Sequence, residues 1–432
     1  MLRLSTYNEE KHKQQDKKPN STHLMKTKLI LMSAVAALGL IAEVNAANTV
    51  YLTGSTAFRG NCYTVLNAAA PVGPWDSTPN RATRGNTTPG KCSYMLFHGT
   101  IGGTETFVSC FWSGSEAGIA SVVGNAIDNS PYGPLPGAPA TFVKTDGTVS
   151  YTDSSSNPTA TELEASSRSG DLAMADTSIA VSLSSTFSAH DFGVVGIVPF
   201  TWVKNVQSTP LTAWTHLTDV THAQLKVLLG FPQAAAFLTG NTADSQAYVY
   251  PVGRNKGSGT RVNTLADCGY GITKGVVQFS IGGLPFSGGL NLVEVDNNGY
   301  ESGGDVAKAL GVDGSQSQTD PNFGGTGWIA VGYLGVSDAT GIGGTATGNW
   351  LSLNGVMESD GAVEEGQYSL WGNEHLYGAN GISGYKLTFG NNFVTLVGAQ
   401  LGGSTASANS SGIQNGFMHA QKLTDTSVPT RL

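Results

Sequence analysis

Three short segments of this sequence combine serine or threonine with glycine just before a predicted helix. They are Thr53-Gly54-Ser55-Thr56, Gly114-Ser115 and Gly257-Ser258-Gly259-Thr260. The first turn of a helix leaves backbone N–H groups without intrahelical partners and carries the positive end of the helix dipole, so such segments can bind phosphate or sulfate. Glycine allows the backbone to approach an anion closely. The alternative at each position is an ordinary N-cap, in which the hydroxyl bonds only its own helix.

Two charged residues extend this pattern. Arg254 lies four residues before Ser258 and can supply a charge-assisted, bidentate contact to an anion. Asp176 follows Ala173-Met174-Ala175, a run of small apolar residues that predicts a buried strand. Its alternative is a carboxylate that caps the turn after that strand.

The elements that would position these residues alternate between strands and helices. We expect strands at 49–53, within 92–112, and at 173–176, 192–199, 248–252 and 328–334. We expect helices at 57–70, 116–127, 218–229, 260–266 and 306–310. Such alternation predicts an α/β protein with mainly parallel sheets. The segment 129–168 is rich in Pro, Ser, Thr and Gly, which predicts a surface insertion.

Composition narrows the class of protein further. The chain has 432 residues, of which 40% are hydrophobic and 12% are charged, so it can bury a large core and is not disordered throughout. The formal net charge of −8 argues against a nucleic-acid-binding protein, which would normally carry a basic patch. No HExxH or Cys-x-x-Cys motif occurs, and we expect neither a metal nor another cofactor. No Gly-x-Ser-x-Gly motif occurs, so we expect no enzymatic activity and no catalytic residues.

Residues 1–46 resemble an export sequence. Met25-Lys26-Thr27-Lys28 is basic, 29–42 carries no charge, and Val44-Asn45-Ala46 offers small residues for cleavage near Ala46. The apolar run is short for a membrane span. We expect Met25 to be the true start and the mature protein to be periplasmic or extracellular.

The four cysteines would then lie in an oxidising compartment, where disulfides form. Cys92 and Cys110 flank two strand-like runs around Gly102-Gly103. A hairpin turning there would bring the two close, so we predict a Cys92–Cys110 disulfide and leave Cys62 and Cys268 unassigned.

Taken in order, the motifs resemble those of the phosphate-binding proteins of ABC importers. The pattern is Gly-Ser-Thr, Gly-Ser-x-x-Gly, Ala-x-Ala-Asp and Arg-x-x-Gly-Ser-Gly-Thr, and the last, at 254–260, is the most specific. The resemblance covers residues 50–340 and extends between the motifs. The segment 192–199 resembles the strand that crosses into the second lobe, and Gly327–Tyr333 resembles a family Gly-x-Ile-Gly-Tyr strand.

The resemblance implies a two-lobed periplasmic-binding fold of type II with the ligand cleft between the lobes. Lobe one would comprise 48–196 plus 343–432, and lobe two 197–342. The resemblance implies that an exported, monomeric protein binds phosphate or a similar oxyanion and delivers it to ABC permease subunits. The implied ligand shell consists of Thr56, the backbone of Ala57, Ser115, Asp176, Arg254, Ser258, Gly259 and Thr260.

Within that shell the donors would surround the oxygens of the anion. Asp176 would accept a hydrogen bond from the proton that phosphate retains near pH 7. Sulfate has no such proton and would leave the carboxylate without a hydrogen bond. Two departures stand out: Lys256 replaces an acid that often braces the arginine, and Asn373-Glu374 replaces Arg-Pro. Two other classes stay open, a receptor for another oxyanion or small solute and a secreted surface or matrix protein using the fold as a scaffold.

Overall fold

A computed structural model describes residues 47–84, 86, 88–125, 169–314, 327–342, 348–403, 405, 407–425 and 427–432. The expected export sequence and the expected insertion at 129–168 lie outside these residues. No helix in the described part of the chain is long and apolar enough to cross a membrane.

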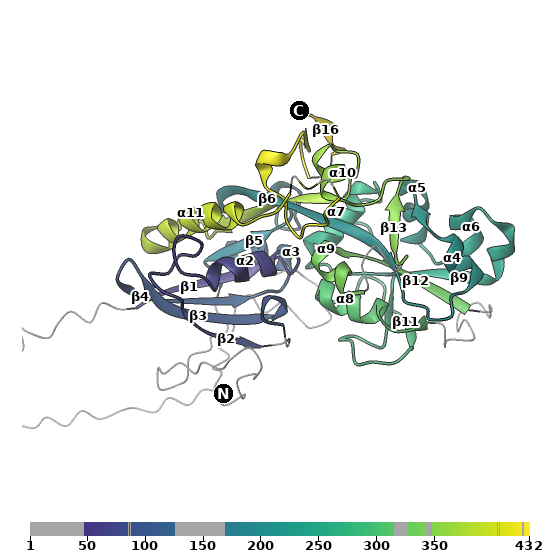
Figure 1. Ribbon diagram of the computed structural model, residues 1–432, viewed down its shortest axis with the longest axis horizontal. Helices are drawn as coiled ribbons and strands as arrows, with labels where there is room; N and C mark the ends of the chain where they lie inside the picture. Colours follow the sequence, from purple (N-terminus) through teal and green to yellow (C-terminus); the bar gives the residue numbers. More distant parts are fainter. Residues whose placement is uncertain are drawn as a thin grey trace, which may run out of the picture. The chain divides into compact units, whose positions relative to one another are not determined.

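The described residues form a mixed α/β fold around a long sheet, which confirms the expected class (Figure 1). Its strand order is β11-β10-β9-β12-β6-β14-β5-β1-β4-β3-β2. We call β5-β1-β4-β3-β2 the β1 half and β11-β10-β9-β12 the β9 half. The β1 half contains β1 (Asn48–Gly54), β2 (Asn80–Arg84), β3 (Tyr94–Ile101), β4 (Thr104–Phe111) and β5 (Leu172–Ala175). The β9 half contains β9 (Ala247–Val252), β10 (Phe279–Ile281), β11 (Leu292–Glu294) and β12 (Gly327–Gly335).

Two long strands join the halves. β6 (His190–Lys204) pairs with β14 (Trp371–Gly378) along 190–199 and with β12 along 200–204, so one strand belongs to both halves. Its residues from Val195 onward are buried, as the apolar run 192–199 predicts for a strand covered on both faces.

The direction of strand pairing differs between the middle of each half and its borders. β1 runs parallel to β4 and β5, and β9 runs parallel to β10 and β12. The pairings of β6, β14, β2 and β3 are antiparallel. The expectation of parallel sheets therefore holds for the strands that precede the predicted site segments, and the borders make the sheet as a whole mixed.

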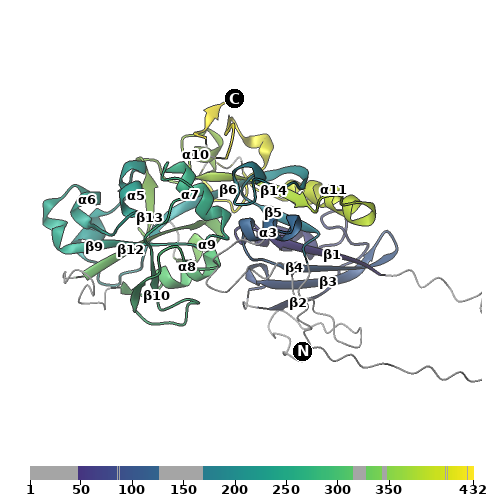
Figure 2. The same ribbon diagram turned by 180° about the vertical axis from the view of Figure 1, so that it is seen from behind.

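Helices cover the sheet on both sides (Figures 1 and 2). α8 illustrates why: Val306, Ala309 and Leu310 repeat at helical spacing and are buried where the helix packs on β12. The helices are α2 (Arg59–Leu66), α3 (Ser115–Val123), α4 (Thr212–His216), α5 (His222–Leu228), α6 (Ala235–Thr239), α7 (Gly259–Asp267), α8 (Gly303–Leu310), α9 (Val336–Ala339), α10 (Asp360–Glu364) and α11 (Gly384–Ala399).

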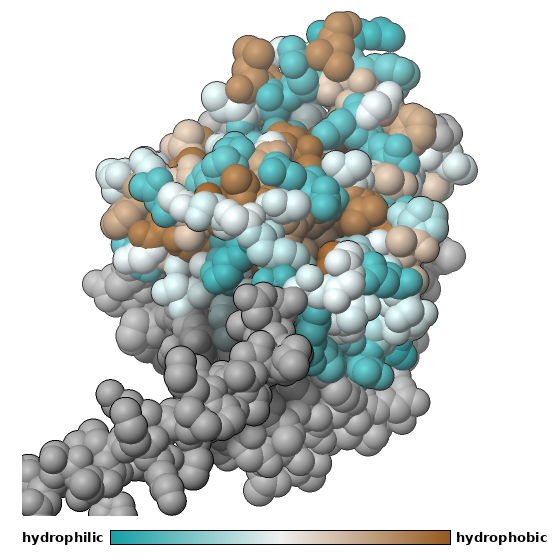
Figure 3. All heavy atoms as spheres, turned by 90° about the vertical axis from the view of Figure 1, so that its left-hand side faces the viewer, coloured by the Kyte–Doolittle hydropathy of each residue, from teal (hydrophilic) through white to brown (hydrophobic). Residues whose placement is uncertain are grey.

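Short strands and the last residues complete the fold. β13 (Trp350–Leu353) pairs with β6 and with β7 (Asp219–Val220), while β8 (Gln233–Ala234) pairs with β9. Near the C-terminus, β15 (Ala420–Gln421) pairs with β16 (Thr430–Arg431). On the face shown in Figure 3, hydrophobic and hydrophilic side chains are interspersed. A pocket of about 380 Å³ lies between α11 and residues 70–74.

The predicted helix 218–229 begins later than expected. Asp219 lies in β7 rather than in a first helical turn, and α5 starts at His222. The reason is a capping box, in which the Thr221 hydroxyl accepts from the Gln224 N–H and the Gln224 side chain accepts from the Thr221 N–H. That pair of bonds ends the strand conformation and starts the helix.

The predicted Cys92–Cys110 disulfide is wrong. The hairpin turns at Gly102-Gly103 as expected, but Cys110 lies opposite Met95, and Cys92 precedes β3. The Cys92 thiol lies 3.2 Å from the carbonyl oxygen of Asn86 instead. All four cysteines are free and buried.

Candidate functional site

The predicted site segments of the β1 half follow three adjacent strands. Thr56 comes after β1, Ser115 follows β4 and begins α3, and Asp176 follows β5. Because β5, β1 and β4 are parallel neighbours, their carboxyl ends meet at one edge of the sheet and bring these residues together. All three are at most 3% exposed, and the Ser115 hydroxyl accepts a hydrogen bond from the Asp176 N–H at 3.3 Å.

The segments of the β9 half come from one strand-to-helix connection. Arg254 follows β9, and Ser258 caps α7 by accepting from the Arg261 N–H. Gly259 and Thr260 form the first turn of α7. Ser258 is therefore an N-cap, which was the alternative weighed for each serine or threonine before a helix.

The two sets of residues meet. The Arg254 guanidinium donates to the Thr56 hydroxyl at 3.2 Å, and the Thr260 hydroxyl donates to Asp176 Oδ2 at 3.5 Å. A Cβ added at Gly259 would lie 1.7 Å from Asp176 Oδ1, so only glycine allows α7 to approach this closely. The helices α3 and α7 also contact each other, and the Ala117 N–H donates to the Gly257 carbonyl at 3.3 Å. Ala57 is buried beside Thr56, at 6% exposure.

Burial controls the charge on Asp176. Loss of water raises the pKa of this carboxyl to about 6, against the lowering effects of Ser115 and Arg254. One carboxylate oxygen, Oδ1, has no hydrogen-bond partner among the described residues. The carboxylate accepts from Thr260 in α7, and no residue of the following turn in the described part of the chain donates to it. Oδ1 is therefore left to accept a further hydrogen bond.

Arg254 is held in place by backbone carbonyls. Its guanidinium donates to Tyr300 O at 3.2 Å and to Glu301 O at 2.6 Å. Burial lowers its pKa, and Asp338 and Asp176 oppose that effect by raising it. Asp338, from α9, thus supplies the negative charge that Lys256 does not.

Sequence reasoning missed three buried charged residues near this cluster. Glu374 in β14 is fully buried, and burial together with the charge of Asp176 raises its pKa well above the usual range. Arg59, at the start of α2, and Asp338 are 4% and 3% exposed. The sequence signal for Arg59 was its position three residues after Thr56, because this places a cation next to the predicted site segment 53–56. Glu374 stood out in the sequence only as part of Asn373-Glu374, where Arg-Pro is common, and no signal points to Asp338.

A serine, a histidine and an aspartate meet elsewhere. His222 Nε2 lies 2.9 Å from Asp267 Oδ2 and 3.3 Å from Ser369 Oγ. In a hydrolytic triad the acid and the nucleophile contact opposite ring nitrogens, whereas here both contact Nε2. This cluster therefore does not activate Ser369.

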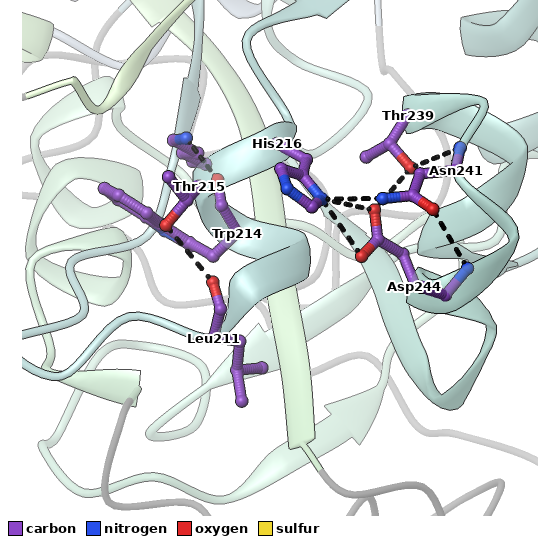
Figure 4. Close-up of polar contacts among 9 residues, drawn as sticks. Leu211, Trp214, Thr215, His216, Thr239, Asn241 and Asp244 are labelled. Carbon is purple, nitrogen blue, oxygen red and sulfur yellow. Dashed lines mark hydrogen bonds and ion pairs between the residues drawn. The ribbon is translucent and has the colours of Figure 1, made fainter.

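A second histidine cluster has a structural role (Figure 4). His216 Nδ1 lies 3.0 Å from Asp244, and the Thr239 hydroxyl donates to the same carboxylate at 2.7 Å. The Asn241 side chain also lies 3.2 Å from His216 Nδ1. These contacts connect α4 with the end of α6 and the following turn. Within the described residues, no group of three or more His, Cys, Asp or Glu could hold a metal ion.

Comparison with known proteins gives solved structures only, since no protein-family model and no curated protein matches the chain. A putative phosphate ABC transporter substrate-binding protein with bound phosphate from Clostridium perfringens is 12% identical, with 82% of this chain and 94% of that chain covered and a TM-score of 0.44. An ABC-type phosphate transport receptor from Vibrio cholerae is 13% identical, with 81% of this chain and 94% of that chain covered and a TM-score of 0.37. PstS from Borrelia burgdorferi is 12% identical, with 81% of this chain and 92% of that chain covered and a TM-score of 0.33. Similarity at this level does not determine a ligand, so the function depends on the geometry of the site.

Proposed function

We propose that this chain is an exported solute-binding protein that takes phosphate between the β1 half and the β9 half and delivers it to an ABC importer. The observation that carries the proposal is the contact of Arg254 with Thr56, together with the approach of Gly259 and Thr260 to Asp176. Residues from four separate segments thereby form one buried cluster of donors around one carboxylate.

The cluster suits a tetrahedral oxyanion that keeps one proton. Arg254, Thr56, Ser115 and Thr260 can donate to anion oxygens, and the first turn of α7 adds backbone N–H groups. Asp176 would accept the hydrogen bond of a protonated phosphate oxygen. In the present structure these groups bond one another, so an anion would replace their mutual bonds.

The proposed lobes are 48–196 with 343–432 and 197–342, linked through β6 and β14. An anion that bonds Thr56 on one side and Arg254 on the other would stabilise the closed arrangement, because its bonds form fully only when both lobes are in contact with it.

Calorimetry with the purified mature protein tests the proposal. Phosphate should bind, sulfate should bind more weakly, and Arg254→Ala should weaken phosphate binding by about 1.5–3 kcal/mol. Arg81→Ala is the matched control, because Arg81 bonds Asn67 and lies over the Tyr63 ring instead. Failure of the wild-type protein to bind phosphate would refute the proposal. Tighter binding of another oxyanion would favour the alternative receptor, and no binding of any solute would favour the scaffold.

A further inference from the structure

Arg59 is a buried cation close to Arg254. It is 4% exposed, and its guanidinium makes no hydrogen bond or ion pair with any residue that the structure describes. Taking a charge out of water is costly unless an opposite charge or a set of acceptors replaces the water. The surroundings of Arg59 therefore indicate where such a group would bind.

The guanidinium of Arg59 faces the start of α8. A methyl group at Gly304 would lie 3.3 Å from Arg59 Nη2 and 3.7 Å from Asp338 Oδ1. Arg59 also lies close enough to Arg254 to lower the pKa of that arginine by charge repulsion. Because a methyl group at Gly303 would lie 3.7 Å from Arg254 Nη1, both arginines face the start of α8.

A pocket of about 440 Å³ begins at this point. Gly304 and Asp338 line it, together with Lys91 from the turn before β3 and Lys308 from α8. Lys308 is paired with Asp305 at 2.8 Å, and the Lys91 ammonium donates to the Ser337 carbonyl at 3.5 Å. Asp338 is the carboxylate of the lining, and it already opposes the charge of Arg254. The positive charges of Arg59 and Lys91 thus exceed the negative charge at the pocket.

We propose that the ligand carries two linked anionic groups, as inorganic pyrophosphate does, and that Arg59 holds the second group in this pocket. The inference rests on the proposed function, because the first group occupies the Arg254–Asp176 cluster. A single phosphate in that cluster would leave the charge of Arg59 unmatched. A second phosphoryl group linked to the first would lie toward Gly304, which the Arg59 guanidinium approaches and which lines the pocket.

Calorimetry with inorganic phosphate and inorganic pyrophosphate tests the inference on the wild-type protein and three variants. The wild-type protein should bind pyrophosphate about tenfold more tightly than phosphate, the scale of one charge-assisted bond. Arg59→Ala should reduce or abolish this preference. Lys91→Gln replaces a partly exposed side chain that lines the pocket, and it should reduce the preference as well. Arg81→Ala should leave it unchanged.

The outcomes separate the inference from the proposed function. If phosphate binds but pyrophosphate binds no more tightly, the second-anion site is refuted and the phosphate proposal stands. If Arg59→Ala lowers both affinities by the same factor, Arg59 belongs to the first site, and the inference is again wrong. If the wild-type protein binds neither anion, both proposals fail.

Discussion

Replacement of Asp176 by asparagine should stabilise the unliganded protein in a manner that depends on pH. The amide has the shape of the carboxylate but no charge, and the carboxylate is 1% exposed. Burial raises the pKa of Asp176 from 3.8 to about 6, so ionising this group costs more in the folded state than in the unfolded one.

The magnitude follows from that shift. Below pH 3.8 the group is protonated in both states and contributes no difference. As the pH rises from 3.8 to 6 the unfolded state ionises first, so the folded state loses stability, and above pH 6 the full cost remains. A shift of roughly two units corresponds to about 3 kcal/mol. Asp176→Asn should therefore be more stable than wild type by about 3 kcal/mol at pH 7, and the gap should shrink toward pH 4.

Urea unfolding of both proteins at several pH values between 4 and 8, without phosphate, measures this gap. Glu105→Gln is the control, because Glu105 is an exposed carboxylate in the β3–β4 hairpin, and its variant should stay within about 1 kcal/mol of wild type at every pH. A gap between wild type and Asp176→Asn that does not vary with pH would refute the assignment of a buried, destabilising charge to Asp176. With phosphate and sulfate in competition, the same variant should lose discrimination, and an unaltered ratio would remove the argument for a shared proton.

Two further substitutions and one labelling experiment have defined outcomes. Gly259→Ala places Cβ 1.7 Å from Asp176 Oδ1, so it should lower the free energy of unfolding by about 1–3 kcal/mol and prevent phosphate binding. Gly416→Ala is the control, because a Cβ there meets no atom within 4 Å, and it should have neither effect. Thermal unfolding and calorimetry measure the two effects, and equal behaviour of the two variants would show that α7 does not approach Asp176 closely. Thr221→Ala removes the capping box of α5 and should cost about 1 kcal/mol in urea unfolding, and no loss would mean that the box contributes nothing. All four cysteines should react with an alkylating agent after unfolding without reductant, and a mass showing fewer modified thiols would contradict their free state.

Local sequence patterns predicted many of the strands and helices of this fold. The alternation of strands and helices predicted β1, β5, β9, β12 and the helices that follow β1, β4 and β9, because apolar periodicity and helix-start residues act over a few positions. The predicted start of α5 was wrong, because residues 219–220 form the short strand β7 and the helix begins only after the capping box at Thr221. The partner of β7 is β13, more than 130 residues away, so local patterns could not indicate this strand. The Cys92–Cys110 pairing failed because the register of a hairpin depends on contacts that spacing alone does not specify.

The sequence by itself determined which residues could serve an oxyanion, since the glycine and hydroxyl segments, Asp176 and Arg254 are local features of strand ends and helix starts. Only the tertiary structure decided which charges surround them. Arg59, Asp338 and Glu374 come from elements separated by up to 315 positions along the chain. The fold brings Arg59 and Asp338 close enough to affect the pKa of Arg254, and it brings Glu374 close enough for the charge of Asp176 to raise its pKa. Burial strengthens electrostatic interactions between such distant residues, so the charge balance of the site is a property of the fold and not of any single segment.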